Sequence, residues 1–423
     1  MLLTLGVMRR RVASYTEPDS AMRTRVSVFR IAGIVLLLLL FYTIAGGRLP
    51  FEHQLIGFTR YDRAIQTGAV HASSRDLDHS LRLSLTILEF LLLLLAVAGA
   101  FGKTRIERWL NLRVFSLSVT VASACTLFVF LSRLGVEAEW YPLAGLMTNP
   151  ATLPVFGHRL LLVWPADALK YLVPRLSYLQ CYYATQIVAI FLAVITIGEW
   201  SAIFIGGRLK FIGQLLLVAM LGPTFYYFTF YDIAMVFFFA WSLLLLYRGK
   251  YALFVLVLGL GTLNHENTLL LVPLAAFVLW REKPPKIAMG VPCAGLGAYI
   301  LARLAMQWAM PMHTLFYFRV WTNILELAHP SRGLVQSALS LVFWWACAGI
   351  ALPHAEPFLQ RAAILFPLLL IVTILFGQFH EARQFDAFIP VAIALILSLV
   401  RKVLANYMRG TNIFSPLGQE ETP

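Results

Sequence analysis

The fold is decided by the stretch YALFVLVLGLGTLNHENTLLLVPLAAFVLW, from Tyr251 to Trp280, which is apolar at both ends and polar in its middle. A membrane helix needs about 20 apolar residues, so a stretch of about thirty is too long for one span and too short for two. Basic residues flank both ends, at Arg248, Lys250, Arg281, Lys283 and Lys286. Such flanks mark the cytoplasmic side of a membrane protein. We therefore predict two short helices that enter the membrane from the cytoplasm and return to it.

The polar middle of this stretch is Asn264-His265-Glu266-Asn267, which the short-helix pair would place at its tip. A carboxylate at that depth in the membrane is costly, so Glu266 is a functional candidate that needs a partner. Together with His265 it would bind a sugar hydroxyl or a lipid phosphate. The alternative is structural, since asparagine suits helix ends and the four residues would then only cap the two short helices.

Composition places the chain among polytopic membrane proteins. Hydrophobic residues make up 60% of it and charged residues 13%, and its mean hydropathy is +0.76. The net charge of +13 lies mainly in short loops. This distribution indicates membrane orientation and anionic headgroups, and it argues against nucleic acid as a partner.

Besides the short-helix pair, apolar runs predict about ten full transmembrane helices, so the expected fold class is an all-α polytopic membrane protein. These spans lie at about 28–46, 83–102, 114–131, 179–198, 211–230, 233–247, 287–306, 335–352, 362–376 and 387–404. The basic connection 103–113 is cytoplasmic, which places the long loops 47–82 and 132–178 on the outer side. The predicted domains are a cytoplasmic basic tail at 1–27, a single transmembrane domain at 28–404 and a second cytoplasmic tail at 405–423.

The second outer loop contains a run with helical periodicity, HRLLLVWPADALKYLV, from His158 to Val173. It predicts a short interfacial or re-entrant helix. Arg159, near the start of this run, is suited to bind a phosphate, because a guanidinium group matches two oxygens. The alternative is that His158 and Arg159 only anchor the loop at the membrane surface.

Acidic residues and histidines gather on the predicted outer side, whereas the cytoplasmic side is mainly basic, so we expect any chemistry at the outer face. An inverting sugar transfer needs a carboxylate that takes the proton from the acceptor hydroxyl. Asp62, in the first outer loop, is the first candidate for this base and Glu52 is the second. The alternative for Asp62 is a surface ion pair with a neighbouring arginine.

A further group of candidates lies in GQFHEARQFD, from Gly377 to Asp386, which we predict to be an outer turn. The candidates are His380, Glu381 and Arg383, of which Arg383 is the phosphate ligand. Glu381 and Arg383 are too close in sequence to face each other well on a helix, so we expect each to meet a different partner. The alternative is a solvated loop with a snorkelling arginine.

Asp232 stands in the tight turn between two predicted spans, directly after an aromatic run at 225–228. This position places it at the outer surface, where it is a candidate for substrate binding. The alternative is that Asp232 caps the helix that follows it.

Several catalytic motifs are missing from the sequence, namely Walker A, G-x-G-x-x-G after a strand, HExxH, CxxC and G-x-S-x-G. ATP-driven transport, nicotinamide chemistry and zinc proteolysis therefore have no support.

The segment GLGTLNHENTLLLVP, from Gly259 to Pro273, resembles the G-x-x-x-L-T/N-[KHR]-E element of the GT-C superfamily. These are multi-spanning glycosyltransferases that take sugars from polyprenyl-phosphate donors at the non-cytoplasmic face. Their acidic catalytic residue, carried by a long first outer loop, maps onto Asp62 or Glu52. The segment FGHRLLLVWPADAL at 156–169, and the later Glu-x-Arg before a span that contains proline, resemble bacterial membrane proteins of this kind. The chain departs from the family in that its first outer loop has no clear D-E pair.

The resemblance implies a glycosyltransferase of the bacterial inner membrane, with a lipid-linked sugar donor and membrane lipids as partners. It assigns the base to Asp62 and phosphate binding to Arg159 and Arg383, supported by Glu266. A divalent metal is the one cofactor that the resemblance leaves open. Two other functions fit the layout, a transporter or flippase of lipid-linked sugars and a polysaccharide polymerase or ligase. Scarce acidic residues on the cytoplasmic side argue against the first, and large outer loops early in the chain argue against the second.

Overall fold

The structure is a computed structural model, and the part that it describes covers 119–121, 123–124, 126–128, 131, 159, 161–224, 231–280, 282–309, 318–329, 332–377 and 381–410. All these residues belong to one of the two compact units of the chain, which comprises Ile56–Ser84 and Leu112–Pro423. The predicted spans 28–46 and 83–102 lie outside the described residues, and the span 114–131 is described only in part.

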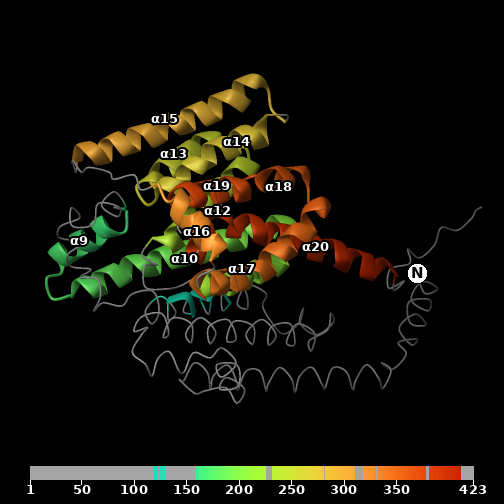
Figure 1. Cartoon of the computed structure of the whole chain (residues 1–423), viewed down its shortest axis with the longest axis horizontal. Coiled ribbons are helices and arrows are strands. Elements are labelled where there is room, and N and C mark those ends of the chain that lie inside the picture. Colours follow the sequence, from blue (N-terminus) through green and yellow to red (C-terminus); the bar gives the residue numbers. More distant parts are fainter. Residues whose placement is uncertain are drawn as a thin grey trace, which may run out of the picture. The chain divides into compact units, whose positions relative to one another are not determined.

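Every regular element of the described residues is a helix (Figure 1). The α-helices are α9 (Val163–Leu172), α10 (Tyr178–Ile205), α11 (Phe211–Leu221), α12 (Asp232–Tyr247), α13 (Tyr251–Thr262), α14 (Leu271–Leu279), α15 (Pro285–Ala309), α16 (Val320–Ala328), α17 (Arg332–Ala351), α18 (Pro357–Ala362), α19 (Leu365–Phe376) and α20 (Ile389–Gly410). The 3-10 helices are η3 (Gly207–Leu209), η4 (Gly222–Thr224), η5 (Glu266–Leu270), η6 (Leu352–His354) and η7 (Ala382–Phe388). The predicted all-α class is therefore confirmed for the described part of the chain.

Within the described residues, three helical stretches are long and apolar enough to cross a membrane, at Gln180–Ile205, Pro285–Ala309 and Pro357–Phe376. Their mean hydropathies are 2.2, 1.5 and 2.2. These stretches support a helical membrane protein, and each coincides with a predicted span.

The short-helix pair predicted from Tyr251 to Trp280 is confirmed. Helix α13 ends at Thr262 and α14 begins at Leu271, with η5 between them. The polar tetrad is the connection between the two helices. Helices α13 and α14 both pack against α15 (Figure 1).

Two predicted span boundaries were wrong for identifiable reasons. The span 211–230 stops early, because α11 ends at Leu221 and Gly222-Pro223 follows in a 3-10 turn; proline removes a backbone donor and disfavours continued α-helix. The span 179–198 runs on to Ile205 through Gly198. A Cβ atom at Gly198 would lie 2.7 Å from the Gln214 Nε2 atom, so this glycine permits close packing between α10 and α11 and does not end the helix.

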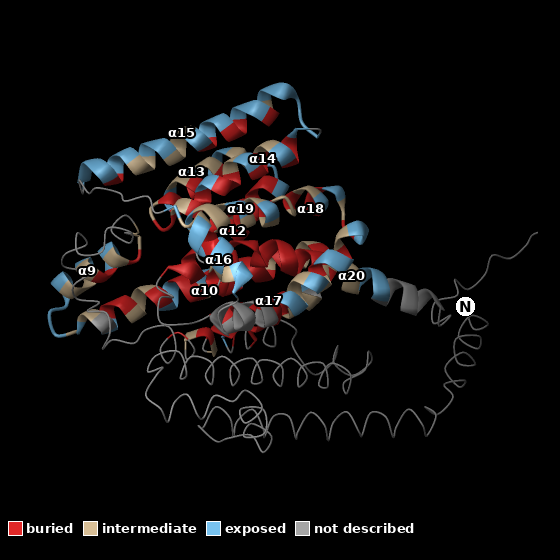
Figure 2. Cartoon of the chain, in the orientation of Figure 1, coloured by how far each residue is buried: buried red, intermediate tan, exposed pale blue. Residues whose placement is uncertain are grey.

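The core lies along α11, α12 and the junction of η7 with α20, which carry the longest runs of buried residues (Figure 2). Helix α10 packs against α11, α12 and α20. Trp200 of α10 is fully buried and donates its indole N–H to the Pro390 carbonyl oxygen at 2.9 Å. In contrast, α15 exposes large apolar side chains such as Leu301 and Trp308, as a lipid-facing helix would.

Ionic and polar contacts join the far ends of several helices. Arg361 of α18 pairs with Glu282, which follows α14, and Tyr247 at the end of α12 donates to Glu356 at 3.4 Å. These contacts bring the predicted cytoplasmic connections 248–250, 281–286 and 353–361 to one end of the helices. Which side of the membrane this end faces stays a prediction.

Part of the predicted outer turn Gly377–Asp386 is instead a buried 3-10 helix, since η7 begins at Ala382, whereas residues 378–380 lie outside the described part of the chain. In a 3-10 helix, side chains at i and i+3 are aligned. Phe385 and Phe388 form one such row, and their rings lie 6.0 and 5.3 Å from the ring of Phe366, near the start of α19. The segment therefore folds back along α19 and carries its other side chains into the bundle.

Gly261, near the end of α13, allows the short-helix pair to approach α12. A Cβ atom at Gly261 would lie 2.9 Å from Thr268 Cγ2 and 3.0 Å from Phe238 Cγ. We expect Gly261→Ala to lower the free energy of unfolding by about 1–3 kcal/mol, the usual cost of overpacking. Thermal unfolding of the purified protein in detergent measures this.

The matched control for this prediction is Gly297→Ala in α15, because a Cβ atom there meets nothing within 4 Å. Alanine favours a helix interior by about 1 kcal/mol over glycine, so this variant should be as stable as wild type or slightly more stable. Equal unfolding temperatures for the two variants would show that the close approach at Gly261 does not matter.

Candidate functional site

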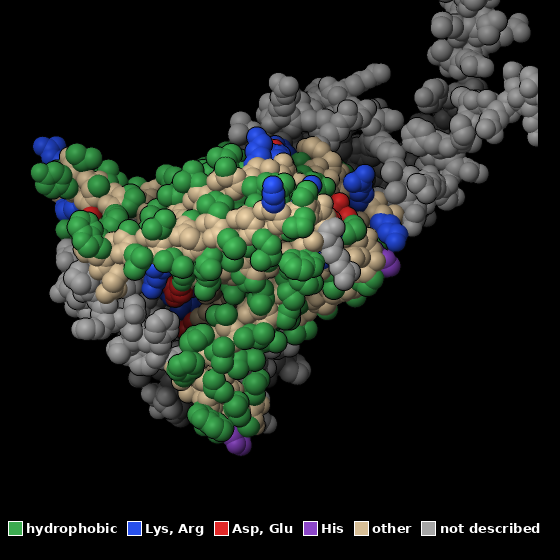
Figure 3. Space-filling model, turned by 90° about the horizontal axis from the view of Figure 1, so that it is seen from above, with side chains coloured by type: hydrophobic (Ala, Val, Ile, Leu, Met, Phe, Trp, Pro, Cys, Tyr) green, Lys and Arg blue, Asp and Glu red, His purple; other side chains and the backbone are tan. Residues whose placement is uncertain are grey.

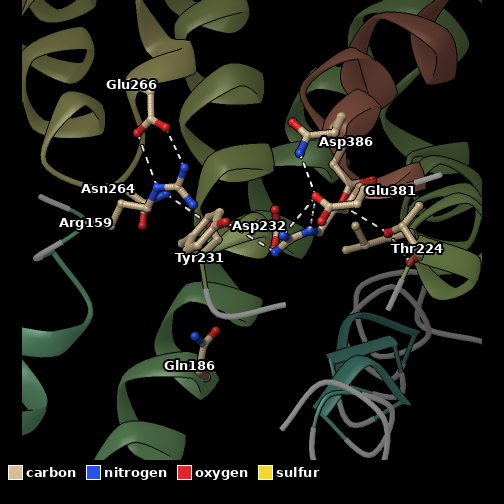
Figure 4. A network of polar contacts seen from close by, with 12 residues as sticks. Arg159, Gln186, Thr224, Tyr231, Asp232, Asn264, Glu266, Glu381 and Asp386 are labelled. Carbon is tan, nitrogen blue, oxygen red and sulfur yellow. Dashed lines mark hydrogen bonds and ion pairs between the residues drawn. The ribbon is translucent and has the colours of Figure 1, made fainter. Parts of the chain in front are cut away.

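A polar cluster lies where several helices begin or end (Figure 4). Its residues come from the segment before α9, from η4, from the start of α12, from the connection between α13 and α14, and from η7. We call this set the polar cluster, and its members are Arg159, Thr224, Tyr231, Asp232, His265, Glu266, Glu381, Arg383 and Asp386. Segments far apart in the sequence thus bring their ionisable side chains together.

Arg159 and Glu266 form a two-point ion pair at one side of the cluster. The Arg159 Nη2 atom lies 2.5 Å from Glu266 Oε1, and Arg159 Nε donates to Glu266 Oε2 at 3.2 Å. The backbone supports this pair, because the Leu161 N–H donates to the Leu263 carbonyl oxygen at 3.1 Å. Two parallel bonds to one carboxylate are the strongest arrangement that a guanidinium forms. The partner that Glu266 was expected to need is therefore Arg159.

Tyr231 lies between the two arginines of the cluster. The Arg159 Cζ atom is 3.9 Å from the centre of the Tyr231 ring and the Arg383 Cζ atom is 5.7 Å from it. Arg383 Nη1 also donates to the Tyr231 hydroxyl oxygen at 3.3 Å. Cations near the face of an aromatic ring are attracted by its quadrupole. One ring therefore holds two guanidinium groups close to each other.

Burial and the neighbouring charges shift the pKa values of Tyr231 and Arg159. Burial raises the pKa of Tyr231 to about 12, although Arg159 and Arg383 oppose the rise. Burial alone would lower the pKa of Arg159, but Glu266 and Tyr231 hold it above its usual range. At neutral pH the ring is therefore a neutral phenol and Arg159 is a cation.

Arg383 contacts two carboxylates as well as Tyr231. Its Nη2 atom lies 3.0 Å from Glu381 Oε2, and its Nη1 atom lies 3.8 Å from Asp232 Oδ2. The expectation that Glu381 and Arg383 meet different partners was wrong. Glu381 precedes η7 with extended backbone angles, φ −90° and ψ 92°, so it does not follow the helical spacing on which that expectation rested.

Asp232 was expected in a turn at the outer surface, with capping of the next helix as the alternative; the structure buries its side chain and shows no side-chain cap, while its side of the membrane stays a prediction. Its exposed fraction is only 2%, and it pairs with Arg383. The helix α12 begins after Tyr231 and shows no side-chain cap hydrogen bond. The short connection between α11 and α12 therefore turns Asp232 into the bundle.

His265 caps η5, as the structural alternative predicted. Its Nδ1 atom accepts a hydrogen bond from the Asn267 N–H at 3.0 Å, and its ring lies 4.9 Å from the ring of Tyr231. Asn264 donates to the Tyr231 carbonyl oxygen at 3.0 Å. The tetrad therefore has the capping role, and its hydrogen bonds lie next to Tyr231 and the pair of Glu266 with Arg159, while its role in substrate binding stays a prediction.

Sequence reasoning missed three members of the cluster, Thr224, Tyr231 and Asp386. Asp386 is fully buried and accepts a hydrogen bond from the Thr224 hydroxyl at 3.1 Å. The signal was present, since Asp386 stands three residues after Arg383 and shares its side of a 3-10 helix. Tyr231 directly precedes Asp232, but an aromatic residue at a helix start looks like part of an interfacial belt.

The cluster reaches the surface at Glu266, whose side chain is 41% exposed while that of Arg159 is 8% exposed. Figure 3 shows acidic and basic side chains gathered in a recess of an otherwise largely apolar face. A ligand that enters from this side would meet Glu266 and Arg159 first and Arg383 behind them.

Four predicted site residues, Asp62, Glu52, His158 and His380, lie outside the described residues. Within the described part of the chain, no group of three or more His, Cys, Asp or Glu side chains is arranged to hold a metal ion.

Comparison of the chain with family models, with curated proteins and with solved structures gave no match. The functional argument therefore depends on the geometry of the polar cluster.

Proposed function

We propose that the protein is a membrane glycosyltransferase that moves a sugar from a polyprenyl-phosphate donor to an acceptor at the non-cytoplasmic face. The observation that carries this proposal is the placement of Arg159 and Arg383 around one tyrosine ring, at the ends of apolar helices. A lipid phosphate has an apolar tail and a charged head, and this site offers apolar helix surfaces next to two cations. The GT-C-like layout with ten full spans belongs to the same proposal.

In this proposal the two guanidinium groups hold the phosphate of the donor. Arginine suits this task because its planar fork donates to two oxygens at once and keeps its charge. As the sugar leaves, negative charge grows on the phosphate, and fixed cations in a dry site stabilise it. Glu266, which is partly exposed, would give up its bonds to Arg159 when the phosphate arrives.

The base that takes the proton from the acceptor hydroxyl is proposed to be Asp62, with Glu52 as the second candidate. The proposal routes no step through a metal ion.

Donor turnover by the purified protein in lipid vesicles tests this function. A panel of polyprenyl-phosphate-linked hexoses is incubated with wild type and with Asp62→Asn, and the release of polyprenyl phosphate is measured. Removing a general base typically costs about 100- to 10,000-fold in rate, so we expect Asp62→Asn to lose that much. Equal turnover by the two proteins would remove Asp62 from the mechanism, and Glu52→Gln would then be tested in the same way.

A carrier of lipid-linked sugars is the second candidate. It is favoured by the fact that Glu266, Glu381 and Asp232 all act as counter-ions of arginines, so none of them is free for catalysis. A carrier would move labelled donor across vesicle membranes without releasing polyprenyl phosphate. Movement without release would replace the enzyme proposal by this one.

A further inference from the structure

We propose that Asp386 and Asp232 form a proton-binding site at the buried end of the polar cluster, and that Asp386 holds the proton in the resting protein. This site adjoins Arg383, which lies 3.8 Å from Asp232, but its existence does not depend on the proposed function.

The first observation is that both aspartates have a buried oxygen without a hydrogen bond. Asp386 Oδ1 and Asp232 Oδ2 have no hydrogen-bond partner in the part of the chain that the structure describes. The exposed fractions of the two residues are 0% and 2%. An ionised carboxylate can only accept hydrogen bonds, so two of them cannot satisfy each other. One added proton turns one carboxyl group into a donor.

The second observation is the charge balance around Asp386. The charged groups that act on it are Asp232 from α12 and Arg383 from η7 itself, and the Thr224 hydroxyl from η4 donates to it. Glu381 already occupies Arg383 at 3.0 Å. The neighbouring helix α19 has no charged residue, and the charged side chains described in α20, Arg401 and Lys402, lie in the second half of that helix and are exposed. Three carboxyl groups therefore share one guanidinium.

Full ionisation of these three groups would leave an excess of buried negative charge. Arg159 also acts on Asp232, but it is paired with Glu266. Two carboxyl groups that share a buried site do not both ionise, and the one with fewer compensating contacts keeps its proton. Asp386 is that group, because Asp232 lies 3.8 Å from Arg383, whereas within the described residues Asp386 forms no ion pair and accepts its hydrogen bond from the Thr224 hydroxyl.

The chemistry is a simple protonation equilibrium. The proton binds to Oδ1 of Asp386, the Thr224 hydroxyl continues to donate to Oδ2, and loss of the proton leaves a carboxylate beside Asp232. A consequence that does rest on the proposed function is that the proton removes one negative charge from the cluster. Arg159 and Arg383 would then bind an anion more tightly.

Infrared spectroscopy of the protein in lipid vesicles tests the proposal, because protonated and ionised carboxyl groups absorb at different frequencies. At neutral pH we expect wild type to show a protonated carboxyl band that Asp386→Asn lacks. The control is Glu199→Gln, which removes an exposed carboxylate paired with Lys210 and should leave this band in place. If Asp386→Asn loses an ionised carboxylate band instead, the proposal is wrong.

The pH dependence of stability gives a second and independent measurement. A carboxyl group that is protonated in the folded state and ionised in the unfolded state stabilises the fold at low pH, and this stabilisation is lost as the pH rises. The unfolding temperature of wild type should therefore fall as the pH is raised from neutral to alkaline, and Asp386→Asn should remove much of that fall. Because an amide resembles a neutral carboxyl group in shape, a variant less stable than wild type at neutral pH would overturn the proposal.

Two further results would also overturn it. A band that changes when a chelator is added would point to a metal ion in place of the proton. The absence of a protonated carboxyl band in the wild-type protein at neutral pH would also overturn the proposal. This measurement needs no variant, so it does not depend on whether Asp386→Asn folds.

Discussion

Arg383→Met is expected to lower the free energy of unfolding by about 3–5 kcal/mol, because removing one partner of a buried ion pair leaves uncompensated charge in the core. The charges left behind are those of Glu381, 3.0 Å from Arg383, and of Asp232, 3.8 Å from it. Methionine fills a similar volume, so lost packing contributes little. Thermal or urea unfolding of the purified protein in detergent measures the loss.

Two control variants test whether the loss of stability comes from the charge of Arg383. The double variant Arg383→Met with Glu381→Gln removes one of the stranded charges, so it should recover part of the lost stability. Arg361→Met removes an arginine from a partly exposed ion pair with Glu282, and such pairs are worth only about 0–1 kcal/mol. A similar loss for Arg383→Met and Arg361→Met would contradict the account of the buried charges.

Arg159→Gln is expected to weaken the binding of farnesyl phosphate by about 10- to 150-fold, because a hydrogen bond to a charged group is worth about 1.5–3 kcal/mol. Farnesyl phosphate serves as a short lipid phosphate. Farnesol, which lacks the phosphate, should bind wild type and the variant equally. Quenching of tryptophan fluorescence in lipid nanodiscs provides the measurement.

Arg159→Lys provides the matched variant for charge without the guanidinium fork. It should bind farnesyl phosphate with intermediate affinity, since lysine keeps the charge but not the two-point geometry. Arg361→Gln, at the other end of the helices, should leave the affinity unchanged. A phosphate affinity that is the same in wild type and Arg159→Gln would remove Arg159 from the proposed binding site.

Much of the helical layout could be predicted because lipid restricts the chain to helices whose lengths follow from hydropathy. The short-helix pair is an example, since the polar tetrad at 264–267 interrupts an apolar stretch of fixed length. The re-entry of η7 could not be predicted in this way. Its seven residues are too few for a hydropathy signal, and their burial depends on contacts with Phe366 and Tyr231 that are distant in the sequence.

The same limit applies to the site. The cost of burying charge in a membrane protein singled out Glu266, and the phosphate-binding fork of arginine singled out Arg159 and Arg383. The long-range partners of these residues were not predictable, because Arg159 with Glu266 and Arg383 with Asp232 join residues more than a hundred positions apart. Tyr231 was missed for a related reason, since its importance lies in the two cations that meet on its ring.

The central claim is that Arg159 and Arg383 bind one phosphate group beside Tyr231. An electron cryomicroscopy structure of the protein in lipid nanodiscs with farnesyl phosphate tests it most directly. We predict density for the phosphate within hydrogen-bond distance of both guanidinium groups, with the Glu266 carboxylate moved away from Arg159. A phosphate bound elsewhere, while the ion pair of Arg159 and Glu266 stays intact, would contradict the account.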